Sequence, residues 1–351
     1  MKPIYSSPES RRSQGFSLIE LMVSLTIGLV IAIASFSAYL GASGSSRMTD
    51  VQSRMNEDGQ AALMILAQQV RMTGNNPRQG NRTEESSRNP IYLPTPTYTL
   101  PTPTFTFSTG AYSLANVRVR GCDGTFANVT STTATIDTLD TSTCVSGTTT
   151  TPADSIAVNY EADLYNTIAT TSGLIRPTDC LGARLTQITA TVPTITATTP
   201  TIITSTAAFY VAENRFYIGT SATIRSPSLY CKGNGSSSTQ QPLVENIEDM
   251  QFMYGTVVSN AVVTTAATTP TIAPVAGYLR ADQVVAQADW NKVTVVRICV
   301  IVRSENPIVS EAGSSQYYKC DGSLDTTKTD RRLRRAYSTT VALRNQQLLL
   351  P

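Results

Sequence analysis

An uncharged apolar run near the N-terminus constrains this chain more than any other feature of its sequence. Residues 21–40 read LMVSLTIGLVIAIASFSAYL and carry no formal charge. At a rise of about 1.5 Å per residue, a helix of about 20 residues crosses the hydrocarbon core of a bilayer. A removable secretory signal has a shorter apolar region followed by a small-residue cleavage site. The run therefore predicts a transmembrane helix over about residues 21–40.

Basic residues precede this run, and all six cysteines follow it. Lys2, Arg11 and Arg12 come first, which by the positive-inside tendency leaves the N-terminus in the cytoplasm and the bulk of the chain outside. An even number of widely spaced cysteines is typical of disulfides in an oxidising compartment. Of the fifteen possible pairings, we favour the sequential one because it closes the shortest loops: Cys122 with Cys144, Cys180 with Cys231, and Cys299 with Cys320.

Composition and motifs argue against most catalytic sites. Histidine is absent from the chain, which excludes Ser-His and Cys-His nucleophiles and His-ligated metals. We find no P-loop, dinucleotide fingerprint, nucleophile elbow or zinc spacing. A net charge of +2 provides no global field to recruit nucleic acid. We therefore expect no enzymatic activity, no cofactor and no metal; a membrane-anchored periplasmic enzyme that uses only carboxylates is the alternative from this class.

One carboxylate, Glu20, lies at the head of the apolar run in the segment GFSLIELM. A carboxylate near a membrane interior costs on the order of 2–3 kcal/mol or more, so such groups usually have a partner. A simpler interpretation places Glu20 at the interface among headgroups. If the chain is cut between Gly15 and Phe16, however, Phe16 gains a free amine one helical turn from Glu20. We expect the carboxylate to pair with that amine, in its own chain or in a neighbour's.

The segment Gly15–Met22, preceded by a short basic leader and followed by the apolar run, resembles the type IV prepilin signature. The resemblance implies cleavage by a prepilin peptidase after Gly15 and N-methylation of Phe16. It also implies that Glu20 helps to recruit the subunit into a helical fibre. The expected organisation is a cleaved leader (1–15), a long helix (16–73) and a β-rich periplasmic or extracellular domain (74–351).

A second apolar pattern extends the helix beyond the membrane. Apolar residues recur at helical spacing, and the segment Gly74-Asn75-Asn76-Pro77 then ends the helix. The first half of the helix is apolar all round, whereas the second half is apolar on one side. This pattern predicts a segment that packs among other helices at one end and under its own globular domain at the other. The stripe comprises Met48, Val51, Met55, Ala62, Leu66 and Val70.

The chain after the helix is typical of strands and loops. Residues 74–110 are rich in Pro and Thr, which predicts an extended loop or edge strand. Short alternating segments between residues 111 and 206 indicate strands separated by Thr-rich loops, although a glycosylated stalk is an alternative for such a composition. Residues 208–218 indicate a hairpin, and residues 243–255 a short amphipathic turn or helix that leads into a strand.

The last third of the chain predicts two further strands. Residues 290–304, WNKVTVVRICVIVRS, have apolar side chains on both faces, so we expect a strand covered on both sides, one of them by the long helix. Residues 331–346 predict the final strand. Its arginines either contact DNA phosphates or form an ion-paired surface, which we favour: Arg331, Arg332, Arg334 and Arg335.

Two Asp-Gly segments resemble fragments of calcium loops. The segment Asp321–Asp325 has oxygen ligands beside a Gly turn but lacks the length and carboxylate count of an EF-hand loop. We therefore favour an Asx turn there, and also at Asp123-Gly124.

The predicted fold class is α+β, the type IV pilin fold: a long N-terminal helix, transmembrane in its first half, packs on the antiparallel sheet of a C-terminal domain with Thr-rich loop insertions. The order of segments from residue 247 to residue 345 also resembles PilW-type minor pilins and, more loosely, J-type pseudopilins of type II secretion systems. A J-like pseudopilin is therefore the alternative function.

The resemblance to minor pilins implies a structural protein. Such a protein is expected to co-assemble with other minor pilins and the major pilin on an inner-membrane assembly platform, to prime pilus assembly and to sit at the pilus tip. There it would present a large adhesin and support adhesion, twitching motility or DNA uptake. Before assembly, we expect it in the inner membrane as a single-pass protein with a periplasmic C-terminal domain.

Overall fold

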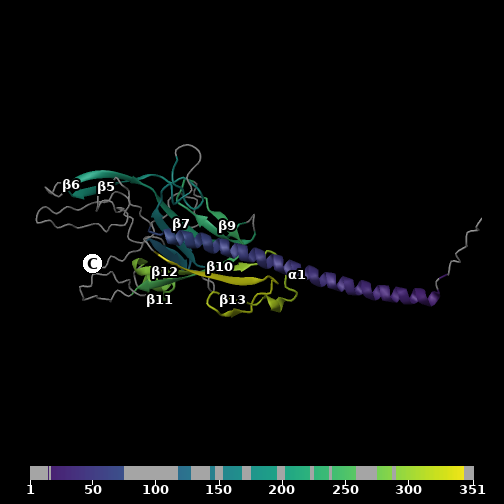
Figure 1. The fold of residues 1–351 in the computed structure, drawn as a ribbon. Coiled ribbons are helices and arrows are strands. Elements are labelled where there is room, and N and C mark those ends of the chain that lie inside the picture. Colours follow the sequence, from purple (N-terminus) through teal and green to yellow (C-terminus); the bar gives the residue numbers. More distant parts are fainter. Residues whose placement is uncertain are drawn as a thin grey trace, which may run out of the picture. The chain divides into compact units, whose positions relative to one another are not determined.

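A computed structural model describes residues 15, 17–74, 118–127, 143–146, 153–167, 175–195, 202–221, 225–236, 239–257, 275–286 and 290–343. Phe16, nearly all of the predicted 74–110 loop and most of the Thr-rich stretches lie outside these residues. The chain divides into two compact units, residues 1–53 and 54–351. A single 55-residue helix, α1 (Leu18–Met72), runs through the boundary between them (Figure 1).

Both ends of α1 are set by local sequence signals. At its start, the Ser17 carbonyl accepts hydrogen bonds from the amides of Glu20 and Leu21 at 3.1 and 3.2 Å, as expected for an N-cap residue. At its end, Gly74 adopts a φ of +69°, which a glycine tolerates without strain. The Gly74 amide donates to the Asn159 carbonyl at 2.9 Å. The predicted helix is therefore confirmed to within two residues at each end.

The two largest sheets of the second unit are antiparallel (Figure 1). The first sheet has the strand order β1-β4-β7-β8-β9, and the second has the order β11-β10-β12-β15. The chain passes from the first sheet to the second at Asn246, which lies between β9 and β10 with a φ of +63°. The strands of the first sheet are β1 (Val119–Cys122), β4 (Ser155–Glu161), β7 (Val211–Thr220), β8 (Pro227–Lys232) and β9 (Gln241–Glu245). Those of the second are β10 (Ile247–Val257), β11 (Val275–Leu279), β12 (Val293–Arg303) and β15 (Arg334–Ala342).

Smaller elements surround these sheets. Three strand pairs, β2-β3, β5-β6 and β13-β14, form separate antiparallel ladders. Short helices lie between β11 and β12 and after β12. The bounds are β2 (Gly124–Phe126), β3 (Cys144–Ser146), β5 (Ile188–Ile195), β6 (Ile202–Phe209), β13 (Tyr317–Tyr318), β14 (Leu324–Asp325), α2 (Ala281–Ala286), η1 (Trp290–Lys292) and η2 (Ala312–Ser315).

One local prediction is wrong, and a second is right only in part. Residues 208–218 do not form a hairpin, because β7 pairs with β4 and β8 while β6 pairs with β5. Residues 243–255 lead into the predicted strand, β10, but the segment before it is not a helix: it is the strand β9, which meets β10 at a bend at Asn246. In both segments, side chains that the sequence pattern suggested for a turn or a solvent-facing helix are held in strands by distant partners. The α+β class, with a long helix followed by antiparallel sheets, is confirmed.

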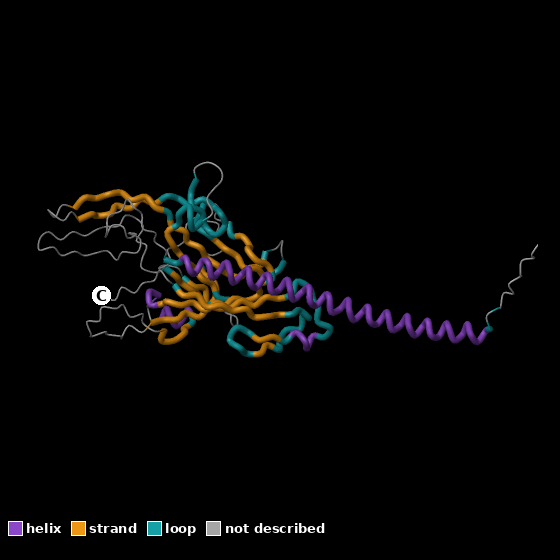
Figure 2. The backbone as a smooth tube through the Cα atoms, in the orientation of Figure 1, coloured by secondary structure: helices purple, strands orange, loops and turns teal. Residues whose placement is uncertain are grey.

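Residues 54–72 of α1 pack on both sheets (Figure 2). Near the end of the helix, Gln69 Oε1 accepts a hydrogen bond from Asn214 Nδ2 of β7 at 2.8 Å. Earlier in the helix, Asn56 Oδ1 accepts one from Tyr337 Oη of β15 at 2.6 Å. Between these contacts the helix buries its apolar stripe, which comprises Met55, Gly59, Ala62, Leu66, Ala67 and Val70.

The central strand β12 is buried on both faces, as predicted from its sequence. Val300 pairs in register with Tyr337, which contacts α1, so this face of the sheet lies under the helix. The preceding residue in the strand, Cys299, points to the opposite face and is bonded to Cys320 of the loop that follows β12. The helix therefore covers one face of the second sheet, and the 304–333 loop covers the other.

Gly59 allows the closest approach of α1 to the second sheet. A Cβ atom at this position would lie 2.7–2.9 Å from three ring atoms of Tyr337. We expect Gly59→Ala to destabilise the unit by about 1–3 kcal/mol through overpacking, despite the gain of up to about 1 kcal/mol from the better helix former.

This prediction is checked by chemical denaturation of the full chain in detergent. Gly59→Ala combined with Tyr337→Leu removes the ring and is expected to recover part of the loss. Equal losses in the single and double variants would show that the ring is not the obstacle. Gly44→Ala is the matched control, because a Cβ there meets no atom within 4 Å.

Candidate functional site

The predicted processing site lies at the exposed start of the structure. Gly15 is exposed, and a Cβ built on it meets no atom within 4 Å. Ser17 follows as the residue that caps α1, and its Oγ accepts a weak hydrogen bond from the Glu20 amide at 3.4 Å. Phe16 lies outside the described residues.

The first half of α1 presents apolar side chains on all sides. Its most apolar 18-residue window has a mean hydropathy of 2.3 and is not buried at all, and by length and composition α1 qualifies as a membrane-spanning helix. Polar side chains within this part bond back to the helix. Ser24, Thr26 and Ser37 each donate a hydroxyl hydrogen bond to a carbonyl three residues earlier, at 2.8–3.0 Å. These hydroxyls can therefore enter lipid without losing a hydrogen bond.

Glu20 differs from these hydroxyl groups. It is exposed in the first turn of α1, between the exposed apolar residues Ile19 and Leu21. No residue that the structure describes lies within ion-pair or hydrogen-bond distance of its carboxylate. The positive end of the helix dipole favours a carboxylate in this turn but supplies only about 0.3–1 kcal/mol. In lipid, Glu20 therefore needs a cationic or hydrogen-bonding partner.

The structure brings the six cysteines together as three disulfides. They join Cys122 to Cys144, Cys180 to Cys231, and Cys299 to Cys320, with Cα–Cα distances of 5.5, 6.6 and 5.8 Å. This is the sequential pairing that the sequence analysis favoured. The first disulfide ties β1 to β3, the second ties the segment before β5 to β8, and the third ties β12 to the 304–333 loop. Each disulfide fastens a loop or a short strand to one of the two sheets.

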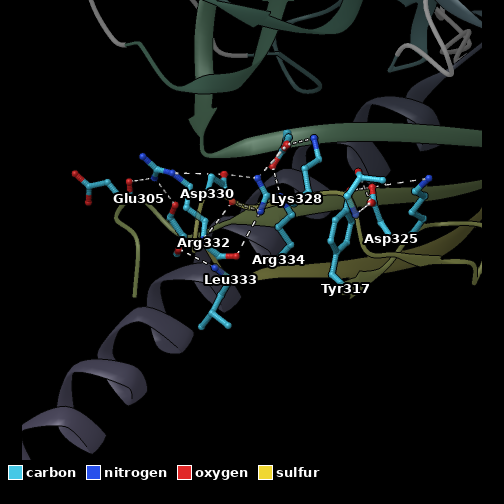
Figure 3. A network of polar contacts seen from close by, with 12 residues as sticks. Glu305, Tyr317, Asp325, Lys328, Asp330, Arg332, Leu333 and Arg334 are labelled. Carbon is cyan, nitrogen blue, oxygen red and sulfur yellow. Dashed lines mark hydrogen bonds and ion pairs between the residues drawn. The ribbon is translucent and has the colours of Figure 1, made fainter. Parts of the chain in front are cut away.

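Arg334, one of the C-terminal arginines, lies at the centre of an ion-pair network on the face of the second sheet opposite α1 (Figure 3). The Arg334 side chain is 1% exposed and forms ion pairs with Glu248 of β10 at 2.7 Å and with Asp330 at 2.6 Å. Its guanidinium also lies over the Tyr317 ring, 5.6 Å from the centroid. Lys328 pairs with Glu248 at 3.2 Å. The network therefore holds the 304–333 loop against the sheet.

Hydrogen bonds between the members of this network shift their pKa values. Burial alone would lower the pKa of Arg334, but its bonds to Asp330 and Glu248 outweigh this and raise it. The hydrogen bond from Arg334 lowers the pKa of Asp330 to about 2. Because this folded-state pKa lies below the ordinary value of 3.8, the contribution of Asp330 is present above pH 4 and is lost as the pH falls toward 2.

The other predicted arginines also bond within the protein. Arg331 Nε donates to the Val309 carbonyl at 2.9 Å, and Arg332 donates to the carbonyls of Ser304 and Glu305. Arg335 lies over the Tyr337 ring at 5.6 Å. The ion-paired interpretation is confirmed for Arg334. Its partner Glu248, 86 residues away in the chain, was not identified from sequence, because no local pattern joins the two residues.

Asp321 forms the predicted Asx turn. Its Oδ1 accepts hydrogen bonds from the Ser323 amide at 2.8 Å and the Ser323 hydroxyl at 2.7 Å. At the other Asp-Gly segment, Asp123 Oδ2 lies 3.9 Å from a guanidinium nitrogen of Arg280, which is a long ion pair. Within the described ranges, no group of three or more Cys, Asp or Glu side chains has an arrangement that suits a metal ion.

Comparisons with known proteins match both ends of the chain. Residues 10–36 match the family model of the prokaryotic N-terminal methylation motif, and residues 215–345 match that of type IV pilus-assembly protein W, PilW. A solved structure, the type IV-like pilin TTHA1219 from Thermus thermophilus, is 11% identical with a TM-score of 0.23, over 55% of this chain and 80% of that one. A comparison with curated proteins found no match by sequence. The two family matches support a type IV minor pilin.

Proposed function

We propose that this chain, which matches the prokaryotic N-terminal methylation motif near its N-terminus and the PilW family over residues 215–345, is a subunit that primes assembly of a type IV pilus and sits at its tip. One observation carries the proposal. The exposed apolar half of α1 bears a carboxylate in its first turn and continues without a break into a half that packs under its own sheets. A simple membrane anchor needs neither this carboxylate nor an apolar stripe that continues along the same helix.

The proposed docking mechanism is electrostatic. A prepilin peptidase cuts between Gly15 and Phe16, and the new amine of Phe16 is methylated. In the membrane, the Glu20 carboxylate lacks water, and an amine nearby is attracted more strongly than it would be in solution. The N-terminus of an adjacent pilin provides such an amine. Lateral docking of one subunit on another therefore lowers the free energy of both, and the apolar faces of their helices pack as they dock.

The features of the second unit favour a low-copy position. Residues 54–351 form a large domain, which is difficult to repeat at every position of a thin shaft. Its three disulfides favour an oxidising location, so we place this domain in the periplasm before assembly and on the pilus afterwards. The proposed partners are other minor pilins, the major pilin, the inner-membrane assembly platform and a large tip adhesin. Adhesion, twitching motility and DNA uptake would follow from this position.

Deletion of the gene in its native host tests the proposal. We expect surface pili to be lost or reduced at least tenfold in electron micrographs, while secretion of exoproteins is unchanged. Wild-type protein should restore the pili. The Gly15→Leu variant should remain uncut, visible as a missing mobility shift on a gel, and should not restore them. Normal pili together with blocked exoprotein release would identify a J-like pseudopilin instead.

A further inference from the structure

Asp154 joins the two sheets of the second unit. It lies immediately before β4 of the first sheet, and its amide donates to the Met250 carbonyl of β10 at 2.7 Å. Its Oδ2 accepts a hydrogen bond from the Phe252 amide at 2.8 Å. The strand β11 pairs with β10 only from Tyr254 onward, so Asp154 takes the place of a strand beside Met250 and Phe252. Asp154 thus bonds to both free backbone groups at this edge of β10, the Met250 carbonyl and the Phe252 amide, where the two sheets meet.

The other carboxyl oxygen of Asp154 is buried, and acidic side chains lie near the carboxyl group. Asp154 is 4% exposed, and its Oδ1 has no hydrogen-bond donor among the described residues. Asp123, in the corner between β1 and β2, lies within hydrogen-bond reach of the carboxyl group. Asp249 and Tyr254 of β10 also interact electrostatically with this group. Arg280 is a cation beside Asp123, but it lies 3.9 Å away and its side chain is 54% exposed.

Two carboxylates cannot hydrogen-bond to each other unless one of them holds a proton. Burial, followed by repulsion from Asp123, raises the pKa of Asp154 to about 8, against the opposing effect of the Phe252 amide. A proton on Oδ1 would let Asp154 donate to Asp123 while Oδ2 still accepts from Phe252. Protonation thus gives every polar group of Asp154 a partner, whereas ionisation leaves two negative charges side by side.

We infer that Asp154 is a proton-dependent latch between the two sheets, closed when its carboxyl group is protonated and weakened when the group ionises. The direction of this pH dependence follows from the linkage between proton binding and closure of the latch. The folded-state pKa of Asp154 lies above its ordinary value of 3.8, so its contribution to closure is complete below about pH 4. That contribution is lost progressively as the pH rises to about 8, where the closed latch itself ionises. The joint between the sheets therefore loosens with rising pH.

Amide hydrogen exchange of the full chain in detergent micelles tests the latch at the Phe252 amide. Between pH 5 and pH 8, opening of the latch releases one proton, so the opening equilibrium rises about tenfold per pH unit. Intrinsic exchange is base-catalysed and rises by a similar factor. The logarithm of the wild-type exchange rate should therefore climb with a slope near two against pH.

The Asp154→Asn variant separates the proton from the geometry. Its carboxamide can accept a hydrogen bond from the Phe252 amide and donate one to Asp123 at every pH. The slope of the logarithm of the Phe252 exchange rate against pH should therefore fall to near one. At pH 8, exchange of this amide should be much slower than in the wild type. Asp282→Asn is the matched control, because this exposed carboxylate pairs with the same Arg280; it should keep the wild-type slope. Equal slopes in wild type and Asp154→Asn overturn the latch.

A cation between the two carboxylates is the alternative occupant, and the same assay detects it. The exchange series is repeated with calcium chloride added. Protection of the Phe252 amide by calcium in the wild type, absent in Asp154→Asn, would replace the proton with a metal and overturn the proposal. Unchanged wild-type slopes with calcium are the expected result.

Discussion

The Glu20→Ala variant is expected to be cleaved and membrane-bound, but at least tenfold depleted from sheared pili. The carboxylate has no partner among the described residues, and pairing it with a neighbour's amine offsets a cost of on the order of 2–3 kcal/mol in lipid. A loss of about 2 kcal/mol corresponds to roughly thirtyfold weaker docking. The measurement compares the variant in the pilus and membrane fractions by quantitative immunoblot, with the mobility shift of the processed form as the check on cleavage.

Two further variants identify the charge as the cause. Glu20→Gln keeps the size and hydrogen-bonding capacity of the side chain but not its charge, so it should dock nearly as poorly as the alanine variant. Glu57→Ala removes an exposed carboxylate from the second half of the same helix and should assemble normally. Wild-type incorporation of Glu20→Ala would contradict the pairing mechanism, while leaving the membrane anchor intact.

Loss of Arg334 should have the largest effect on the stability of the second unit. Arg334→Met keeps the length of the side chain but leaves Glu248 and Asp330 without their buried cation. Removing one partner of a buried ion pair typically costs about 3–5 kcal/mol. We expect about 3 kcal/mol, because Glu248 and Asp330 are 19% and 38% exposed and retain some water. The free energy of unfolding in denaturant, measured on the full chain, gives the loss.

The matched control is Lys328→Met, which removes the other cation bound to Glu248. Its side chain is 38% exposed, so its ion pair is worth less than about 1 kcal/mol. Similar small losses in the two variants would show that burial of Arg334 contributes little. Limited proteolysis adds a local measure, because the 304–333 loop should be cut faster in Arg334→Met than in the control.

Features with a local physical cause could be predicted from the sequence. The apolar run, the apolar stripe that follows it and the helix-ending segment from Gly74 predict a helix over residues 16–73, close to the observed Leu18–Met72. Alternating apolar side chains on two faces identify β12 as a strand covered on both sides. The Asx turn at Asp321 likewise depends on neighbours in the chain, as does the processing motif around Gly15 and Glu20.

Features that depend on partners far away in the chain could not be predicted from the sequence. Residues 208–218 were predicted to form a hairpin, but in the structure Asn214 lies within the buried strand β7 and bonds to Gln69 and Tyr160. The acidic start of β10 resembled a helix for the same reason: Glu248 finds its cation in Arg334, across the sheet. Asp154 carries no sequence signal, because its role exists only where two sheets meet.

The positions of the disulfides have a mechanical consequence. All six cysteines are used, and each bond closes a loop on one sheet or the other. No covalent crosslink therefore spans the seam between the sheets, which is held by hydrogen bonds, packed side chains and the chain itself at Asn246. Under a pulling force, such as a retracting fibre exerts, the seam should yield first while each crosslinked half stays folded. The domain would then lengthen by a defined step before it breaks.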